Sequence, residues 1–536
     1  MYWHLLLFHY MILISFYMSI LSPMDSNLSN DAEARMTKLQ HIKDLWINPF
    51  PESFDKAQNI DHIINVLGNP ENDLRNFFQV TESPNKNIST AWRLLLLRNH
   101  WGITFWQIKD GYGLMQVMFN KKFCRIIVNK GNSQEEIQWI SAYKLLYKLL
   151  DIGDWIWVQW ELFRTLKDEL TLFVSDFQIL SKSLAPLWEK FHGIEDMDLR
   201  LRKRYLDMIL NDGVKEMLNR RSKFRQSMRE FLLDKWFLEV ETPILENITW
   251  GWDAKPFGTH HDALDIDVKL RISCWELWQK RLMIWWFEKT FEIWRIFRNE
   301  WMSTEHAQDY TQMENYRAFA DYKQMMQLTK EMYLSIIDKV YWKRQFTIRW
   351  HEVDFDKERP EIDYQNLIHS FTWISIANST DNEIKRRLDE LKIAYDWSNR
   401  PRLIDSLWKH CRKNISWPAF LVNIPKSISP LAKSKIDNPE LTNRFQIIIA
   451  WSEVGNGFSE LNDPIDQKER FMVQQTMRDD GDEEAQTPDA DYITALEHGM
   501  PPTAGFWVSE RLFSFLEDKP IREAQYFPLM KPIKKI

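Results

Sequence analysis

Four short segments of this chain combine arginine, carboxylate and aromatic residues in an order that could bind a polyphosphate and a metal ion. They are residues 239–243, 297–316, 453–463 and 499–512. Arg298 and Arg511 lie at expected strands, where a buried arginine is costly unless it has an anionic partner. Arginine donates two parallel hydrogen bonds to phosphate oxygens, and carboxylates bind Mg²⁺. The carboxylates that could do so are Glu276, Glu300, Glu314, Glu453 and Glu460.

Each of these residues also has an ordinary structural interpretation. A single Arg–Glu pair on a strand is usually a salt bridge, and His306 alone in a loop is usually solvated. Phe458 and Tyr316 would usually be core aromatics. The order and spacing of the whole set favour a functional site. The chain has no Walker A loop, which argues against a P-loop NTPase.

The composition describes an ordinary globular protein with a net charge of −7 and three widely spaced cysteines. This charge argues against indiscriminate nucleic-acid coating, and the cysteines disfavour a disulfide framework or a zinc site. Isolated cysteines of this kind fit a protein of a reducing cytoplasm. The apolar run at residues 5–21 could be a signal or anchor. We favour upstream sequence ahead of a start at Met24 or Met36, and expect no stable membrane association.

The chain divides into five expected parts of an α+β protein. Short apolar runs at 86–185, separated by turn signals, predict a five-stranded β-barrel of the OB type with a helix at Glu135–Leu149. A long amphipathic helix at Val214–Asp234 and a strand at Phe237–Val240 open the large mixed domain. Later helices are expected at 323–339 and 382–395. The parts are 1–23 (extension), 24–85 (helical), 86–185 (barrel), 186–212 (basic connector) and 213–536 (large domain).

Tryptophan stands at many positions that usually require glycine. The chain has 27 Trp and 15 Gly, whereas average usage would give roughly 37 Gly. Trp285–Trp286 lie between two apolar β-like segments, and Trp507 precedes a strand-to-helix junction. Such sites favour glycine because it adopts positive φ and allows close backbone approach. The chain reads as an enzyme whose glycines have been replaced.

From about residue 34 to 536 the chain resembles the class II lysyl-tRNA synthetases. The three class II motifs occur in order, and lysine-type signatures lie between them. Aspartyl and asparaginyl relatives do not carry the whole set. The signatures are Glu189–Gly193, Arg202–Asp207, Lys255–His261, Phe458–Pro464 and His498–Thr503.

The resemblance implies a catalytic domain built on an antiparallel β-sheet flanked by helices. It implies ATP, L-lysine and tRNA-Lys as substrates, with Mg²⁺. Arg298 would hold the α-phosphate and the lysine carboxylate, and Arg511 the γ-phosphate. Glu300 and His306 belong to the motif 2 loop. Tyr310 replaces the usual Phe that stacks on adenine.

The resemblance also assigns the lysine and metal contacts. Glu276, Glu460 and Tyr316 match the ammonium and side-chain contacts, and Phe458 matches the aromatic wall. Glu314 and Asn456 match the α-amino and carboxylate contacts. A buried carboxylate selects a cationic substrate, because a neutral competitor leaves the charge unpaired. The implied metal-binding residues are Glu453, Glu460 and Gln446, the last standing where relatives have Glu.

The barrel would read the anticodon, because single-stranded bases stack on aromatic side chains. Arg93, Phe105 and Gln116 are the implied contacts, although Phe105 could instead be a core residue. Relatives form homodimers through the motif 1 helix, here about 213–234, which packs around Pro243.

Thirteen tryptophans fall where relatives have glycine, and random substitution would not choose one residue type. We therefore predict that UGA encodes glycine in the native gene. Trp250, Trp451 and Trp507 would line the pockets, so the Trp-containing form is expected to be inactive. The set is Trp46, Trp92, Trp101, Trp157, Trp160, Trp236, Trp250, Trp285, Trp286, Trp301, Trp350, Trp451 and Trp507.

Three alternatives remain at this point. A paralogue that lysylates a protein would lack the barrel. Aspartyl or asparaginyl specificity is disfavoured because Glu276 and Glu460 would repel an acidic substrate. A non-catalytic RNA-binding paralogue, its pockets filled by Trp, would not need to keep a set of four residues together: Arg298, Glu300, Glu453 and Arg511.

Overall fold

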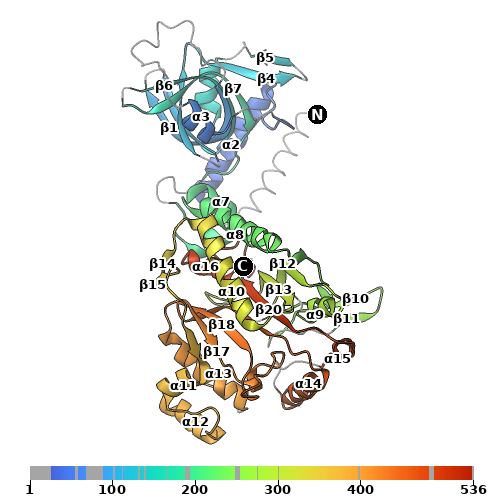
Figure 1. Cartoon of the computed structure of the whole chain (residues 1–536). Helices are drawn as coiled ribbons and strands as arrows, with labels where there is room; N and C mark the ends of the chain where they lie inside the picture. The colour runs from blue at the N-terminus through green and yellow to red at the C-terminus, as the bar shows by residue number, and fades with distance from the viewer. Residues whose placement is uncertain are drawn as a thin grey trace. The chain divides into compact units, whose positions relative to one another are not determined.

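The computed structural model describes two compact units, Met1–Asp212 and Gly213–Ile536 (Figure 1). The expected extension at 1–23 lies outside the described residues. No described helix is long and apolar enough to cross a membrane. The described residues are 26–54, 58–67, 88–100, 103–110, 113–130, 133–137, 141–165, 167–187, 193–247, 254–274, 276–299, 301–395, 399–481 and 488–533.

The first unit is built on one sheet that contains the five expected strands. Its pairings run from β1 to β2, β3, β7 and β6 and return to β1. Strand β4 pairs with β7 and with β5. The strands are β1 (Ile88–His100), β2 (Ile103–Lys109), β3 (Leu114–Asn120), β4 (Arg125–Lys130), β5 (Ser133–Glu136), β6 (Trp155–Arg164) and β7 (Leu170–Ser181).

The expected helix at Glu135–Leu149 is wrong at its start. Glu135 and Glu136 belong to β5, and α5 spans Ala142–Leu149. The apolar period explains the true start, because Ala142, Leu145, Leu146 and Leu149 share one buried helical face. The other helices among the described residues of this unit are α2 (Ser26–Asp44), α3 (Ile60–Leu67), α6 (Met197–Arg202) and α7 (Arg204–Leu210).

The second unit is organised around an eight-stranded sheet. Its order is β16-β17-β18-β19-β20-β13-β12-β8, and only the two outer pairs are parallel. The strands are β8 (Leu238–Glu239), β12 (Lys289–Phe297), β13 (Asp309–Ala318), β16 (Glu361–Asp363), β17 (Ala419–Val422), β18 (Arg444–Ile449), β19 (Ser452–Ser459) and β20 (Thr503–Ser509). This α+β architecture, a large antiparallel sheet flanked by helices, agrees with the prediction.

Helices flank this sheet (Figure 1). The helix α8 (Val214–Asp234) has the predicted bounds, and α10 (Tyr322–Tyr341) packs on it and on β18, β19 and β20. Tyr333 of α10 is fully buried and donates to the backbone oxygen of Val454. The expected helix at 382–395 is shorter, because α12 (Asp381–Glu390) ends before the left-handed Lys392.

The remaining described elements complete this unit. The helices α11 (Tyr364–Thr372), α12 and α13 (Arg400–Cys411) are inserted between β16 and β17 and share a buried core. Two small sheets comprise β9 (Leu245–Glu246), β10 (Gly258–His261) and β11 (Ile266–Leu270), and β14 (Gln345–Ile348) with β15 (His351–Asp354). The other elements are α9 (Glu276–Ile284), η1 (Arg412–Asn414), η2 (Lys426–Ile428), α14 (Pro464–Asp479), α15 (Ala490–Glu497) and α16 (Arg511–Leu516).

Several helices end on a tryptophan in the left-handed conformation. Trp236 has φ +64° after α8, its N–H bonds to Leu233 O, and the next N–H bonds to Leu232 O. This is the Schellman arrangement, whose left-handed position is usually glycine. Trp46 after α2 and Trp286 after α9 repeat both bonds. The segment before Trp285–Trp286 is therefore a helix, and the β-like expectation for it is wrong.

Candidate active site

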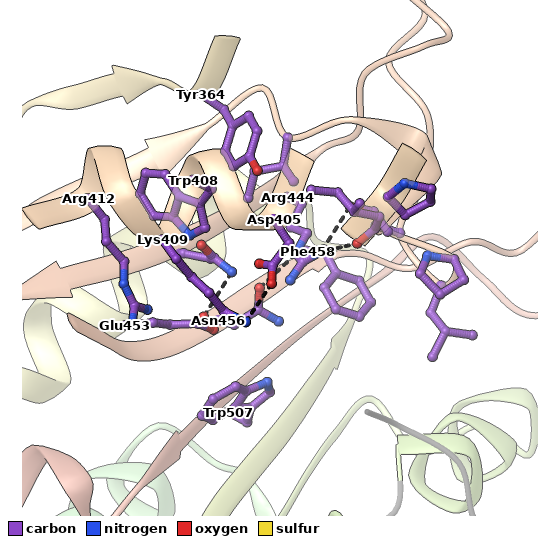
Figure 2. A pocket seen from close by; sticks show the side chains of 18 of the residues that line it. Tyr364, Asp405, Trp408, Lys409, Arg412, Arg444, Glu453, Asn456, Phe458 and Trp507 are labelled. Carbon is purple, nitrogen blue, oxygen red and sulfur yellow. Dashed lines mark hydrogen bonds and ion pairs between the residues drawn. The ribbon is translucent and has the colours of Figure 1, made fainter. Parts of the chain in front are cut away.

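A cavity of about 440 Å³ opens on the eight-stranded sheet. Strands β18, β19 and β20 form one wall, and α13 faces them (Figure 2). The predicted residues that line it are Arg298, His306, Tyr310, Gln446, Glu453, Asn456, Phe458 and Arg511. Segments more than 200 residues apart in sequence thus supply one concave site, the usual form of a small-molecule pocket.

The two predicted phosphate-binding arginines reach the cavity from different strand ends. Arg298 directly follows β12, and its Nε donates to Ile272 O at 3.1 Å. Its guanidinium carbon lies 5.7 Å from the ring centroid of Tyr310. Arg511 begins α16, and its Nη1 donates to the backbone oxygen of Glu453 at 3.1 Å. These backbone bonds orient both guanidinium groups at the cavity.

His306 contributes an uncharged ring. Burial lowers its pKa to about 4, and the positive charges of Arg511, Arg298 and Arg412 act in the same direction. Its Nδ1 lies 2.7 Å from Ser303 Oγ. At neutral pH the imidazole can exchange hydrogen bonds with a ligand but adds no charge.

Glu305, beside His306, is an acid that sequence reasoning did not assign. Its Oε1 lies 2.7 Å from Arg349 Nη2 and accepts a hydrogen bond from Ser452 Oγ. Burial alone would raise its pKa, but the charges of Arg349 and Arg511 lower it. Glu305 is therefore ionised and neutralised by Arg349.

Gln446 and Glu453 face each other across β18 and β19. Gln446 Nε2 donates to Glu453 Oε2 at 3.0 Å. Gln446 Oε1 and Glu453 Oε1 are buried and accept no hydrogen bond from any described residue. Burial raises the pKa of Glu453, although Arg444, Arg511 and Arg412 oppose this. Two buried oxygens without donors are suited to an oxygen-loving cation.

The predicted lysine contacts form a buried polar cluster beside the cavity. Tyr316 donates to Glu314 Oε1 at 2.5 Å, and Ser273 Oγ donates to Glu314 Oε2 at 2.9 Å. Asn456 Oδ1 accepts a bond from Arg444 Nε at 2.8 Å. Glu314 and Tyr316 are only 2% exposed. The cluster is held by internal hydrogen bonds, as a preorganised site must be.

Glu460 has an intramolecular cation that sequence reasoning missed. Lys280 Nζ lies 2.5 Å from Glu460 Oε2, and both side chains are fully buried. The same ammonium lies 5.3 Å from the ring centroid of Phe458. Only a contact between α9 and the segment after β19 creates this pair, and neither segment alone signals it.

Gly505 packs directly against this cluster. A Cβ added there would lie 2.6 Å from Glu460 Oε1 and 2.6 Å from Tyr316 Cε1. Cβ atoms essentially never approach heavy atoms so closely. Glycine at this position therefore leaves the space that Glu460 and Tyr316 occupy.

Not every residue predicted for the site is found among the described residues that line the cavity. Glu300 and Trp250 lie outside the described residues, as does the side chain of Glu276, which begins α9. Trp507 lines the cavity from β20 and is half-buried (Figure 2). Trp451 is wrongly expected to line a pocket. It occupies the turn between β18 and β19, with its ring 5.3 Å from that of Trp350.

The predicted anticodon contacts lie on neighbouring strands of the first unit. Arg93 pairs in register with Lys109, and Gln107 pairs with Gln116. Phe105 follows the same alternation, which places all of these on one face of the sheet. Arg93 Nη1 donates to Gly153 O at 3.0 Å, and Gln116 Nε2 to Thr171 Oγ1 at 2.9 Å.

Phe105 also packs beside a small apolar cluster on that face. The cluster contains Met118, Phe163 and Phe173, and Phe105 itself is half-buried. Its ring is therefore partly a packing element and partly accessible.

The chain is similar in sequence to known tRNA synthetases. A family model described as "tRNA synthetases class II (D, K and N)" matches residues 196–531. The chain therefore belongs to the class II tRNA synthetases of that group. The lysine–tRNA ligase of Fervidobacterium nodosum is 38% identical over 94% of this chain and 95% of its own length. Those of Carboxydothermus hydrogenoformans and a Thermoanaerobacter species are also 38% identical, over 94% and 96% of this chain and 99% of each relative. Within the family, the chain groups with the lysine–tRNA ligases.

Proposed function

We propose that this chain activates L-lysine with ATP and transfers it to the 3′ end of tRNA-Lys. The observation that carries the proposal is a cavity lined by two arginines with a buried carboxylate cluster beside it. Arg298 and Arg511 offer fixed positive charge for phosphates. The carboxylates of Glu314 and Glu460 lie in the adjoining buried cluster, as a cationic substrate requires.

The first step needs positioning and charge more than proton transfer. A carboxylate oxygen of lysine attacks the α-phosphorus of ATP, the bond to the bridging oxygen breaks, and pyrophosphate leaves with its electron pair. Arg298 would bind the α-phosphate and the lysine carboxylate, and Tyr310 would stack on adenine. Arg511 would bind the γ-phosphate. Each donor is held by backbone or ring contacts before the substrate arrives.

Mg²⁺ would bind beside these arginines. No group of three His, Cys, Asp or Glu among the described residues could hold a metal unaided. Gln446 Oε1 and Glu453 Oε1 nevertheless fit a cation that also binds substrate phosphates, because both are buried and lack donors. Mg²⁺ in this place would offset phosphate charge. Glu460 would not share this role, because its carboxylate lies against Lys280.

For the first unit we propose an OB-type barrel that binds the anticodon. The closed series of pairings through β1, β2, β3, β7 and β6 supports it. Phe105 supplies a partly accessible ring for base stacking, and Arg93 and Gln116 lie on the same face. A homodimer through α8 around Pro243 and a cytoplasmic location complete the proposal.

We further propose that the native protein has glycine at the left-handed tryptophans, encoded by UGA. Fifteen described non-glycine residues have positive φ, and seven of them are Trp. Tryptophan is 27 of 536 residues, so fewer than one would be expected by chance. Five belong to the thirteen predicted from the sequence, and Trp342 and Trp373 extend the set. The seven are Trp46, Trp236, Trp286, Trp342, Trp350, Trp373 and Trp451.

Peptide mass spectrometry of the native protein tests the recoding proposal. Glycine at Trp286, Trp342 and Trp507, with UGA codons in the gene, is expected. Tryptophan at these positions, with UGG codons, would contradict it.

Lysine-dependent exchange of pyrophosphate into ATP, followed by charging of tRNA-Lys, tests the enzymatic proposal. The form with glycine at the thirteen predicted positions and at Trp342 and Trp373, called the glycine form, should exchange with lysine and not with aspartate. RNA binding without exchange by the glycine form would instead favour the non-catalytic paralogue.

A further inference from the structure

The charged face of α13 lines the cavity, and no predicted role uses it. Arg402, Asp405 and Lys409 of α13 and Arg412, its helical C-cap, occur at intervals of three, four and three residues, which places them on one helical face. The opposite face holds Leu403, Ile404, Leu407 and Cys411, which are buried in the core of the inserted helices. The apolar face thus anchors the helix, and the charged face forms the wall opposite the sheet.

Arg412 differs from Lys409 and Asp405 on this face because it forms no direct ion pair with a described residue. Lys409 and Asp405 form an ion pair at 2.7 Å. Arg412 makes no side-chain hydrogen bond or ion pair with any of the residues that the structure describes, and it is half-buried at the cavity wall. Its side chain extends towards Glu453 (Figure 2). A partly buried guanidinium in a concave site is ready to bind an anion.

Arg412 also lies close to the expected phosphate subsite. The charge of Arg412 acts to lower the pKa of both His306 and Glu453. The charges of Arg298 and Arg511 act on the pKa of His306 in the same direction. Because His306 is neutral at pH 7, the arginines supply the positive charge of this part of the cavity. Gln446 is also neutral, so Glu453 is the only anionic ligand of the pair, which weakens the hold on a metal ion.

We propose that Arg412 is an ATP-binding residue that contacts the β- and γ-phosphates and the departing pyrophosphate. It acts from the inserted helices, opposite Arg511 on the sheet. This inference rests on the proposed function, because it deepens the description of the same site. Its fixed charge offsets phosphate charge where the metal subsite has only one carboxylate.

Kinetics of the full-length glycine form test this role. For Arg412→Ala, the KM for ATP and the KM for pyrophosphate in the reverse reaction should each rise about 10- to 100-fold, the usual effect of losing a charged hydrogen bond. The KM for lysine should change less than about twofold. In Arg412→Lys the rise in KM should be smaller, because lysine keeps the positive charge but cannot donate two parallel hydrogen bonds. Lys413→Ala, on the exposed neighbouring residue, is the matched control.

Calorimetric titration of the same variants with Mg-ATP and with pyrophosphate separates this inference from the enzymatic proposal. Weaker binding to Arg412→Ala supports the inference even if the wild type exchanges no pyrophosphate. Equal ATP and pyrophosphate binding by wild type and Arg412→Ala overturns it, as does a rise in the KM for tRNA alone. Circular dichroism of each variant, compared with Lys413→Ala, identifies loss of folding. If Arg412→Ala fails to fold, Arg412→Lys and Arg412→Gln take its place in both assays.

Discussion

Lys280 Nζ lies 2.5 Å from Glu460 Oε2 in a fully buried ion pair. The same carboxylate is a proposed contact of the substrate ammonium, and the same Phe458 ring is its proposed aromatic wall. The Lys280–Glu460 pair is neutral as a unit. The ammonium of the lysine substrate therefore also needs the negative charge of the Glu314 carboxylate. Lysine selection is therefore a property of the whole buried cluster and not of Glu460 alone.

A double-mutant cycle separates the structural and substrate roles of Glu460. Glu460→Gln leaves Lys280 buried without its counter-charge and should destabilise the protein by about 3–5 kcal/mol. Lys280→Met combined with Glu460→Gln should restore much of that stability, because replacing both members of a buried pair is often neutral. Lysine binding should stay weak in both. Urea unfolding and lysine titration measure these effects, and normal lysine affinity in the double variant would refute the substrate role.

Gly505→Ala should weaken lysine binding through steric displacement. The new Cβ would force Glu460 and Tyr316 apart. Since a displacement of about 1 Å in a site can cost about 100-fold, kcat/KM for lysine should fall about 10- to 100-fold, with little change for ATP. Gly258→Ala is the control, because a Cβ there meets nothing within 4 Å. Equal lysine kinetics in both variants would exclude this packing role.

Gln446→Glu should strengthen Mg²⁺ binding in the presence of ATP. A second carboxylate beside Glu453 adds a full negative charge a few ångströms from the expected metal, which is sufficient for about tenfold or more. Titration with Mn²⁺ followed by paramagnetic resonance reports the affinity without relying on activity. Gln327→Glu, on the exposed face of α10, controls for net charge. An unchanged affinity would place the metal elsewhere.

Glu246→Gln should stabilise the protein, and increasingly so at higher pH. Burial raises the pKa of Glu246 to about 10 from its ordinary 4.5, the charge of Glu292 adds to this rise, and Arg271 opposes it. Arg271 already pairs with Glu292 at 2.8 Å. Between pH 4.5 and 10 unfolding releases the proton, so wild-type stability falls as pH rises, by up to about 1.4 kcal/mol per pH unit.

Thermal unfolding of Glu246→Gln at pH 5.5 and pH 8.5 measures this effect. The difference in Tm between variant and wild type should be larger at pH 8.5. The exposed Glu469→Gln should show no such trend. A difference that does not depend on pH would mean that Glu246 is ionised in the folded state.

Replacing left-handed tryptophans by glycine should stabilise the Trp-containing form. A side chain in this conformation costs about 1–2 kcal/mol per residue. Trp236→Gly and Trp286→Gly, which are 86% and 91% exposed in the parent chain, lose little packing. Trp294→Gly is the opposite control, because Trp294 lies in β12 and has no positive φ. Glycine within a strand should destabilise, and the two classes of variant should shift Tm in opposite directions.

The sequence predicted the elements whose signals are local. The apolar period of α8 predicted both of its bounds. The order of the motifs predicted that Arg298, Glu453 and Arg511 share one site, and all three line the cavity. It did not predict Lys280–Glu460, because that pair depends on a contact across 180 residues of chain. The charged spacing of α13 resembles that of any solvent-facing helix, so only the fold reveals that it faces the cavity.

The left-handed turns have a consequence for how this gene functions in other cells. Six of the seven left-handed tryptophans are 74–91% exposed, and each would place a large apolar ring in water. If glycine is the native residue, a host with the standard code would produce a strained protein prone to self-association, even with an intact reading frame. The same DNA would yield a working enzyme in one cytoplasm and an aggregating one in another. These left-handed positions would then limit the exchange of this gene between lineages with different codes.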